Sequence, residues 1–219
     1  MVKILGLDEA ARGPVIGSLF IGGVMINEGD EKKLGAVKDS KLLSHKVRIQ
    51  LSKTIMENSD YYVIQVEPKE IDEAVTSKDG MNLNWLEAHK QAEIINKLKP
   101  DKAIIDCPSV NCKAYTEYLK KLLKNKKVNL IVEHKADVNY PVCSAASIIA
   151  KVRREEEMNK IREKYGDVGP GYPSNEITQN FIKENWDKHP EIFRHSWSTF
   201  KKHSNPETNP KKQKKLGEF

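Results

Sequence analysis

Two adjacent carboxylates end the first apolar run of the chain, and they constrain its fold more than any other feature. The run covers residues 2–7 (VKILGL), Asp8 and Glu9 follow it, and residues 10–14 (AARGP) come next. Such a short apolar run predicts a buried strand. Charges buried at its end are costly without a partner. The pair therefore indicates either a metal site, since hard divalent cations prefer carboxylate oxygens, or a solvated strand end beside Arg12.

Two later segments repeat this pattern. Residues 103–106 (AIID) form an apolar run that ends in Asp106, and residues 128–133 (VNLIVE) form another, with Asp137 a short turn later. Sites in α/β sheets form beyond the strand ends, where loops converge. We therefore predict one acidic cluster of four residues: Asp8, Glu9, Asp106 and Asp137. Such carboxylates cannot all stay ionised at close range without a cation, and a two-ion cluster suits in-line phosphoryl chemistry.

The adjacency of Asp8 and Glu9 carries a further expectation. Adjacent residues on a regular strand point to opposite faces of the sheet. If both side chains share one site, the strand must end, bulge or twist there, and the following Arg12-Gly13-Pro14 favours such a break.

The periodicity predicts a mixed α/β protein. Its first two strands are expected to be antiparallel, a third strand follows, and a β-α-β-α alternation comes after them. The strands are expected at residues 2–9, 15–26, 61–66, 102–106 and 128–134. The helices are expected at residues 45–58, 68–76, 82–98, 112–125 and 142–164, with Ser44 as the first N-cap.

The chain is expected to have three parts. Residues 1–165 form the catalytic domain, residues 166–202 form a helical extension packed on it, and residues 203–219 form a flexible basic tail. The net charge of +6 suits a polyanionic partner, and Lys and Arg gather in several segments around the acidic motifs.

The cysteines and the apolar segments indicate a cytoplasmic protein. Cys107 and Cys112 do not have a zinc-binding spacing, no matching Cys/His pair follows, and with Cys143 they are expected to be reduced thiols. Residues 14–26 are apolar but too short to span a bilayer, and no cleavable signal is recognised. A monomer is the default expectation.

Four motifs, in a fixed order, resemble those of the ribonuclease HII family, and most closely its archaeal branch. They are residues 6–14 (GLDEAARGP), 37–41 (VKDSK), 134–151 (HKADVNYPVCSAASIIAK) and 169–174 (GPGYPS), with residues 194–197 (RHSW) beyond them. The resemblance runs from residue 4 to about residue 200.

The resemblance implies a fold and an activity. The fold is ribonuclease H-like, with a mixed five-stranded sheet of three antiparallel and then parallel strands, flanked by helices. The activity is hydrolysis of the RNA strand of RNA–DNA hybrids and incision at ribonucleotides embedded in duplex DNA. Water would attack with the help of Mg²⁺ or Mn²⁺, two ions with substrate bound, and leave a 5′-phosphate and a 3′-hydroxyl.

The resemblance also implies site residues. Asp8, Glu9, Asp106 and Asp137 would be the catalytic metal ligands. The substrate contacts would be Ala11, Arg12, Gly13, Ser40, Lys41, Lys151 and Tyr172, although the lysines are equally compatible with solvated surface. Ala11 stands where the family usually has glycine, and we expect a negative φ there, at which alanine is harmless.

The extreme C-terminus and two rival functions complete the predictions. Gln213, Leu216 and Phe219 resemble the peptide that docks on the sliding clamp PCNA, although a solubilising basic tail is the alternative. The rival functions are a nuclease or recombinase of the same fold that acts on DNA alone, and a basic nucleic-acid-binding module without catalysis.

Overall fold

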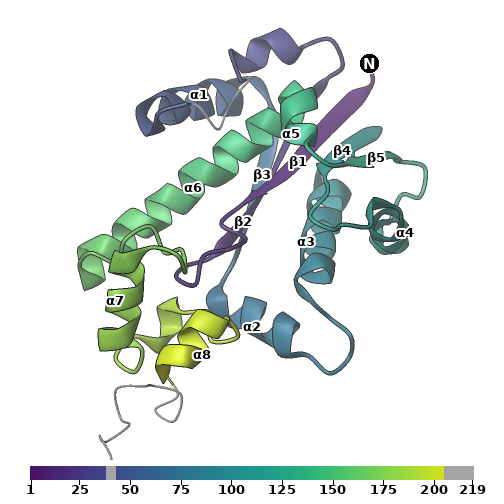
Figure 1. Cartoon of the computed structure of the whole chain (residues 1–219). Helices are drawn as coiled ribbons and strands as arrows, with labels where there is room; N and C mark the ends of the chain where they lie inside the picture. Colours follow the sequence, from purple (N-terminus) through teal and green to yellow (C-terminus); the bar gives the residue numbers. More distant parts are fainter. Residues whose placement is uncertain (38–42, 205–219) are drawn as a thin grey trace, which may run out of the picture.

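The five apolar runs form one mixed sheet in the computed structural model, which describes residues 1–37 and 43–204 (Figure 1). The strands are β1 (Lys3–Ala10), β2 (Leu19–Asn27), β3 (Asp60–Val66), β4 (Lys102–Asp106) and β5 (Asn129–Glu133). Their order in the sheet is β3-β2-β1-β4-β5. β2 pairs antiparallel with β1 and β3, whereas β4 pairs parallel with β1 and β5. The predicted fold class is thereby confirmed.

The helices largely follow the predicted ranges. They are α1 (His45–Asn58), α2 (Pro68–Thr76), α3 (Leu83–Leu98), α4 (Cys112–Leu122), α5 (Ala136–Asn139), α6 (Pro141–Tyr165), α7 (Glu176–Asn185) and α8 (Ser198–Ser204), with 3₁₀ turns η1 (Glu31–Leu34) and η2 (Pro190–Ile192). Ser44 caps α1 as predicted, since its side chain accepts a hydrogen bond from the Val47 amide.

The second strand begins four residues later than predicted. The amide of Val15 donates to the carbonyl oxygen of Gly171 at 2.8 Å, and Ile16 forms an isolated bridge with Phe193. These partners belong to the C-terminal part of the chain. Val15 and Ile16 are therefore apolar because they pack against that part, and not because they extend the sheet.

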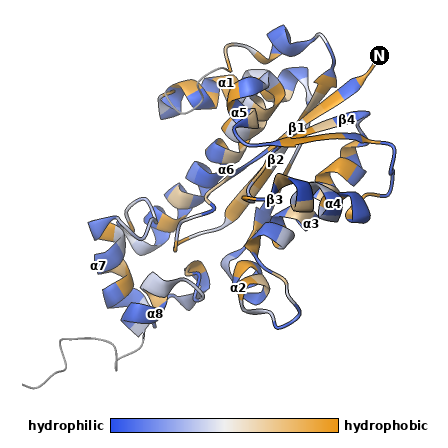
Figure 2. Cartoon of the chain, turned by 45° about the vertical axis from the view of Figure 1, so that its right-hand side comes forward, coloured by the Kyte–Doolittle hydropathy of each residue, from blue (hydrophilic) through white to orange (hydrophobic). Residues whose placement is uncertain are grey.

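Helices cover both faces of the sheet. Figure 1 shows α6 running along one face and α3 with α4 lying on the other. Figure 2 shows the strands between them as mostly hydrophobic. The helices α1 and α6 enclose a core with Ile4, Val24 and Ile104, whereas α3 and α4 enclose one with Leu5, Leu7 and Ile105.

The contact between α6 and the sheet is unusually close. A Cβ atom added to Gly6 would lie 2.2 Å from the backbone carbon of Val142, and one added to Gly22 would lie 2.6 Å from the carbonyl oxygen of Ala146. No side chain fits at these two positions. Glycine is therefore required for α6 to lie directly on the central strands.

The C-terminal helices pack on the far end of α6 and on the β1–β2 connection. Their shared core includes Ile16, Met158, Phe181 and Phe193. In the described ranges, residues 1–37 and 43–204, no helix has the length and apolar character needed to cross a membrane.

Candidate active site

Three of the four predicted carboxylates meet at one edge of the sheet. One oxygen each of Asp8, Asp106 and Asp137 lies within 4.8 Å of the others. Leu7 and Ile105 are partners in the parallel β1–β4 register, so Asp8 and Asp106 are the next residues on adjacent strands. Strand alternation turns both away from the Leu7 face and toward α6. Asp137 comes from the short helix α5, where the sequence predicted only a turn.

Burial and like charge act together on this cluster. Burial is the main reason that the pKa of Asp8 is raised to about 7, and the charges of Asp106 and Asp137 raise it further. Hydrogen bonds from the Ser147 hydroxyl and from the Glu9 amide, which lies 2.8 Å from Asp8 Oδ1, partly oppose the rise. The cluster is therefore a site where negative charge is costly unless a cation shares it.

Glu9 occupies the opposite face of β1. The strand continues through Asp8 and Glu9 to Ala10 in unbroken antiparallel register with β2, so the expected break is wrong. The Glu9 carboxylate is not one of the three within 4.8 Å. It is half-buried beside Glu87, and desolvation, followed by the charges of Glu87, Asp8 and Asp106, raises its pKa well above the usual value.

Glu87 is a residue of this site that sequence reasoning missed. It is wholly buried on α3, and its Oε1 accepts a hydrogen bond from Arg12 Nε at 2.6 Å. Burial is the largest cause raising its pKa to about 7, and the Arg12 charge opposes the shift. The Arg12 Nη2 atom donates to Asn84 Oδ1, also at 2.6 Å. The available signal was Glu87 and Gln91, two polar residues one turn apart on an otherwise apolar helix face.

The loop after β1 is strained at Ala11. Its φ is +67°, a left-handed conformation, so the expectation of a negative φ is wrong. The buried guanidinium of Arg194 donates to the carbonyl oxygens of Ala11, Arg12 and Gly17 at 2.7, 2.9 and 2.9 Å. Trp197 Nε1 donates to the carbonyl of Gly13 at 3.1 Å. Tertiary contacts thus impose on alanine the conformation that glycine adopts easily.

Tyr172 lies against this loop, as the predicted substrate surface requires. A Cβ atom added to Gly13 would be 3.8 Å from Tyr172 Cε1, and the Tyr172 side chain is 40% exposed. The guanidinium carbon of Arg154 lies 5.5 Å from the centre of the tyrosine ring. Ala11, Arg12, Gly13 and Tyr172 are therefore neighbours in space.

The remaining predicted contacts differ in what the structure describes. Lys151 is half-buried on α6, one turn after Ser147, which bonds to Asp8. Ser40 and Lys41 lie outside the described residues, as do Gln213, Leu216 and Phe219.

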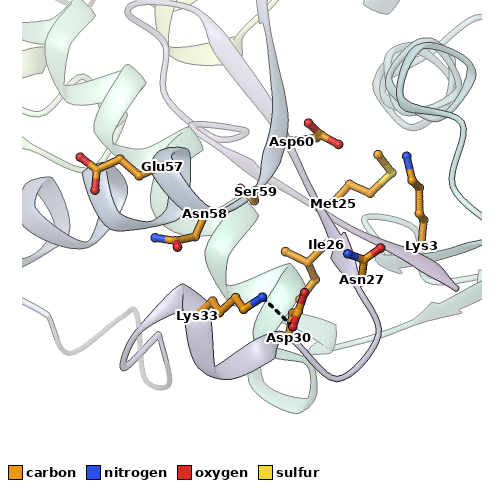
Figure 3. A pocket seen from close by; sticks show the side chains of 10 residues that line it. All are labelled: Lys3, Met25, Ile26, Asn27, Asp30, Lys33, Glu57, Asn58, Ser59 and Asp60. Atoms are coloured by element: carbon orange, nitrogen blue, oxygen red, sulfur yellow. Dashed lines mark ion pairs between the residues drawn. The ribbon is translucent and has the colours of Figure 1, made fainter. Parts of the chain in front are cut away.

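A pocket of about 460 Å³ lies at the opposite end of the sheet (Figure 3). It is lined by Lys3, Met25, Ile26, Asn27, Asp30, Lys33, Glu57, Asn58, Ser59 and Asp60. An ion pair of 2.9 Å joins Asp30 and Lys33 there. None of these lining residues belongs to the predicted site.

The fold and the acidic cluster define a nuclease of the ribonuclease H-like class. The chain matches the family model of Ribonuclease HII over residues 5–200. Ribonuclease HII from Pyrococcus horikoshii is 44% identical over 209 residues, which are 92% of each chain.

Solved structures agree with this match. The ribonuclease H2 from Pyrococcus horikoshii OT3 has a TM-score of 0.84 and 41% identity, with 92% of this chain and 97% of that chain covered. The PCNA:RNase HII complex from Archaeoglobus fulgidus gives a TM-score of 0.80 and 37% identity, with the same coverage. The chain therefore belongs to the ribonuclease HII family, type 2 ribonucleases H that cleave the RNA of RNA–DNA hybrids.

Proposed function

We propose that this enzyme cuts the RNA strand of hybrids and also incises at single ribonucleotides embedded in duplex DNA, leaving a 5′-phosphate and a 3′-hydroxyl. The observation that carries the proposal is the cluster of Asp8, Asp106 and Asp137, in which Asp8 lies three residues before the Ala11–Gly13 loop. The cluster supplies a place for hydrolysis, and the loop supplies a place for recognition of the sugar.

The acidic cluster fits a hard divalent cation. Its donors are carboxylate oxygens within 4.8 Å of one another, the kind that Mg²⁺ and Mn²⁺ prefer. Asp8, Asp106 and Asp137 would hold the ion, and a second ion would bind together with substrate. Glu9, the fourth proposed ligand, would have to turn from Glu87 toward the cluster to reach either ion. Bound cations of this type polarise a phosphate and lower the pKa of an attacking water. The burial of Asp8 and Asp137 limits how far bulk water can screen the charges of the cluster.

The loop at residues 11–13 is suited to detect a ribose 2′-hydroxyl, the group that distinguishes RNA from DNA at one position. Hydrogen bonds from Arg194 and Trp197 hold the loop backbone, and Glu87 and Asn84 hold the Arg12 side chain. The bare Cα of Gly13 leaves space in front of the Tyr172 ring, where the sugar would pack. Ser40, Lys41 and Lys151 would contact phosphates.

The decisive experiment compares Asp106→Asn with Asp79→Asn, an exposed aspartate on a loop that serves as the matched control. The substrates are a long hybrid, a duplex with one ribonucleotide, an all-DNA duplex and an all-RNA duplex. We expect the wild type and Asp79→Asn to cut the first two in the presence of Mg²⁺ or Mn²⁺. Asp106→Asn should cut neither, although its circular dichroism spectrum should be unchanged.

Each rival function predicts a different result. Near-wild-type cleavage by Asp106→Asn would exclude Asp106 as a catalytic metal ligand. Cleavage of the all-DNA duplex would favour the DNA-only nuclease. Tight hybrid binding without any metal-dependent cleavage would favour the non-catalytic binding module.

We also propose that the C-terminal tail docks on a sliding clamp. Gln213, Leu216 and Phe219 are spaced by three residues, so the two apolar side chains could enter one apolar pocket while the amide makes a polar contact. A relative of this chain has been solved in complex with PCNA, which supports the proposal.

The tail proposal is tested by calorimetry with the clamp from the same organism. Deletion of residues 213–219 should abolish binding and leave cleavage of short duplexes intact. The control, in which Lys211 and Lys212 are both replaced by alanine, keeps the motif and should still bind. No heat of binding from the full-length chain would refute the proposal.

A further inference from the structure

A second group of metal-binding side chains lies next to the acidic cluster. Cys107 follows β4 and Asp106, Cys112 is the first residue of α4, and His134 follows β5. One ligand atom from each lies within 4.8 Å of the other two. Cys112 Sγ is 3.3 Å from His134 Nε2. The sequence spacing alone did not indicate this group, because the histidine comes from a different strand end.

The donor atoms of this group differ from those of the acidic cluster. Two sulfurs and an imidazole nitrogen are ligands for zinc and softer cations, whereas magnesium and manganese prefer oxygen. In a tetrahedral zinc site, bonds of about 2.3 Å to sulfur and about 2.0 Å to nitrogen place those two atoms roughly 3.6 Å apart. The 3.3 Å between Cys112 and His134 is close to this separation.

The backbone around the group is fixed. The amide of Cys107 donates to the carbonyl oxygen of Glu133 at 3.0 Å, which joins the ends of β4 and β5. The side chain of Asn111 caps α4 by accepting from the Ala114 amide at 3.0 Å, so the first turn that carries Cys112 is ordered. These contacts bring the three ligands together before any ion binds.

The burial of the three side chains predicts an open coordination position. Cys107 is buried, Cys112 is half-buried and His134 is exposed. An ion held by them would face the protein on one side and solvent on the other. Three protein ligands with a water in the fourth position are a known arrangement for zinc, distinct from closed structural sites with four protein ligands.

We propose that Cys107, Cys112 and His134 bind one Zn²⁺ ion through two thiolates and one imidazole, with water as the fourth ligand. Each thiol releases its proton to solvent when its sulfur binds the ion. The ion links Cys107, the residue after Asp106, to His134, three residues before Asp137. Zinc occupancy therefore stiffens the backbone on which two of the acidic residues stand, whatever substrate the enzyme prefers.

The test uses the reduced full-length chain, freed of metal with a chelator and then supplied with excess Mg²⁺ for the carboxylates. Co²⁺ serves as the spectroscopic probe, because thiolate ligands give it a charge-transfer absorption that carboxylates do not. We expect this absorption to saturate at one equivalent of Co²⁺ and to disappear when one equivalent of Zn²⁺ is added. The readout is independent of hybrid cleavage.

Variants separate this site from other thiols and histidines. Cys112→Ser and His134→Ala change side chains that are not fully buried, so the fold should survive, and each should weaken Co²⁺ binding by at least roughly tenfold. Cys143→Ser and His89→Ala, which alter residues outside the group, should keep the absorption. The proposal is overturned if no thiolate–cobalt absorption develops, or if it survives both Cys112→Ser and His134→Ala. A Cys107–Cys112 disulfide in the isolated protein, detected by mass spectrometry, would also overturn it.

Discussion

The buried guanidinium of Arg194 holds the backbone of Ala11, with 2.7 Å between Nη2 and the alanine carbonyl oxygen. Ala11 has a φ of +67°. A left-handed conformation costs an L-residue about 1–2 kcal/mol, so some other interaction must outweigh that cost. The hydrogen bonds from Arg194 to three carbonyl oxygens supply that interaction. Burial lowers the pKa of this arginine to about 10, so it stays charged at neutral pH.

Replacing Arg194 by lysine should destabilise the fold. Lysine keeps the charge but cannot place three donors on three separate carbonyls as the planar guanidinium does. We expect the free energy of unfolding in urea to fall by about 2–4 kcal/mol. Arg153→Lys, at an exposed ion pair with Glu156, is the control and should change stability by less than about 0.5 kcal/mol. Equal effects of the two variants would contradict the role of Arg194.

Ala11→Gly should stabilise the protein without a large effect on cleavage. Glycine relieves the strain at φ +67°, although it also adds entropy to the unfolded chain, so we expect a net gain of up to about 1 kcal/mol. The Ala11 side chain is only 8% exposed, so its methyl group does not face a substrate. Incision at a single ribonucleotide should therefore change by less than roughly threefold.

The matched control for that substitution is Ala10→Gly. Ala10 lies in β1 with regular pairing to Phe20, so glycine there should cost about 1 kcal/mol. A selective, many-fold gain in single-ribonucleotide incision by Ala11→Gly would show instead that the methyl group obstructs the substrate.

The metal-free protein should lose stability as the pH rises, and Asp8→Asn should prevent part of that loss. The pKa of Asp8 is about 7 in the folded protein, against an ordinary value of 3.8, because of burial and its acidic neighbours. A raised folded pKa stabilises the fold at low pH, and this contribution is lost as the pH rises through about 7. In a chelator at about pH 8, Asp8→Asn should be more stable than wild type by roughly 1–4 kcal/mol.

Two further measurements test the same mechanism. The stability difference between Asp8→Asn and wild type should shrink below about pH 3, where the aspartate is mostly protonated in both folded and unfolded states. Millimolar Mg²⁺ should raise the melting temperature of the wild type and not that of the variant. If the variant is no more stable than wild type in chelator at pH 8, burial does not hold this carboxyl at a raised pKa.

Glu87→Ala should impair hybrid cleavage mainly through KM. Glu87 accepts from Arg12 Nε at 2.6 Å, so its removal frees a side chain proposed to contact substrate. We expect kcat/KM to fall by roughly tenfold or more, with a smaller change in kcat. Glu93→Ala, an exposed position on the same helix, should leave both parameters unchanged. A loss confined to kcat would assign Glu87 to the acidic centre rather than to the positioning of Arg12.

The sequence predicted the sheet and most helices because their signals are local. The apolar run before Asp8 and the one before Asp106 each specify a strand, and parallel pairing then brings these two carboxylates together. Strand alternation also places Glu9 on the face of β1 opposite to Asp8. The prediction that both carboxylates share one site rested on an expected break in the strand.

The features that were missed depend on contacts between distant parts of the chain. The left-handed φ of Ala11 is imposed by Arg194, 183 positions later. Glu87 belongs to the site only because α3 packs on the sheet and brings it to Arg12, and His134 meets Cys112 only because β4 and β5 pair in parallel. Periodicity and short motifs carry no information about such encounters.

The two glycines under α6 determine how accurately the acidic centre is built. A helix that rests on leucine or valine side chains can move when those side chains change rotamer. Here the backbone of α6 contacts the backbone of the strands directly at Gly6 and Gly22. No flexible side chains lie between them, so the distance between α6 and β1 cannot change through a change of rotamer. Ser147 on that helix bonds to Asp8, and the close packing of the helix fixes the position of the serine relative to the aspartate. The precision of the acidic centre depends in part on two positions where the chain has no side chain at all.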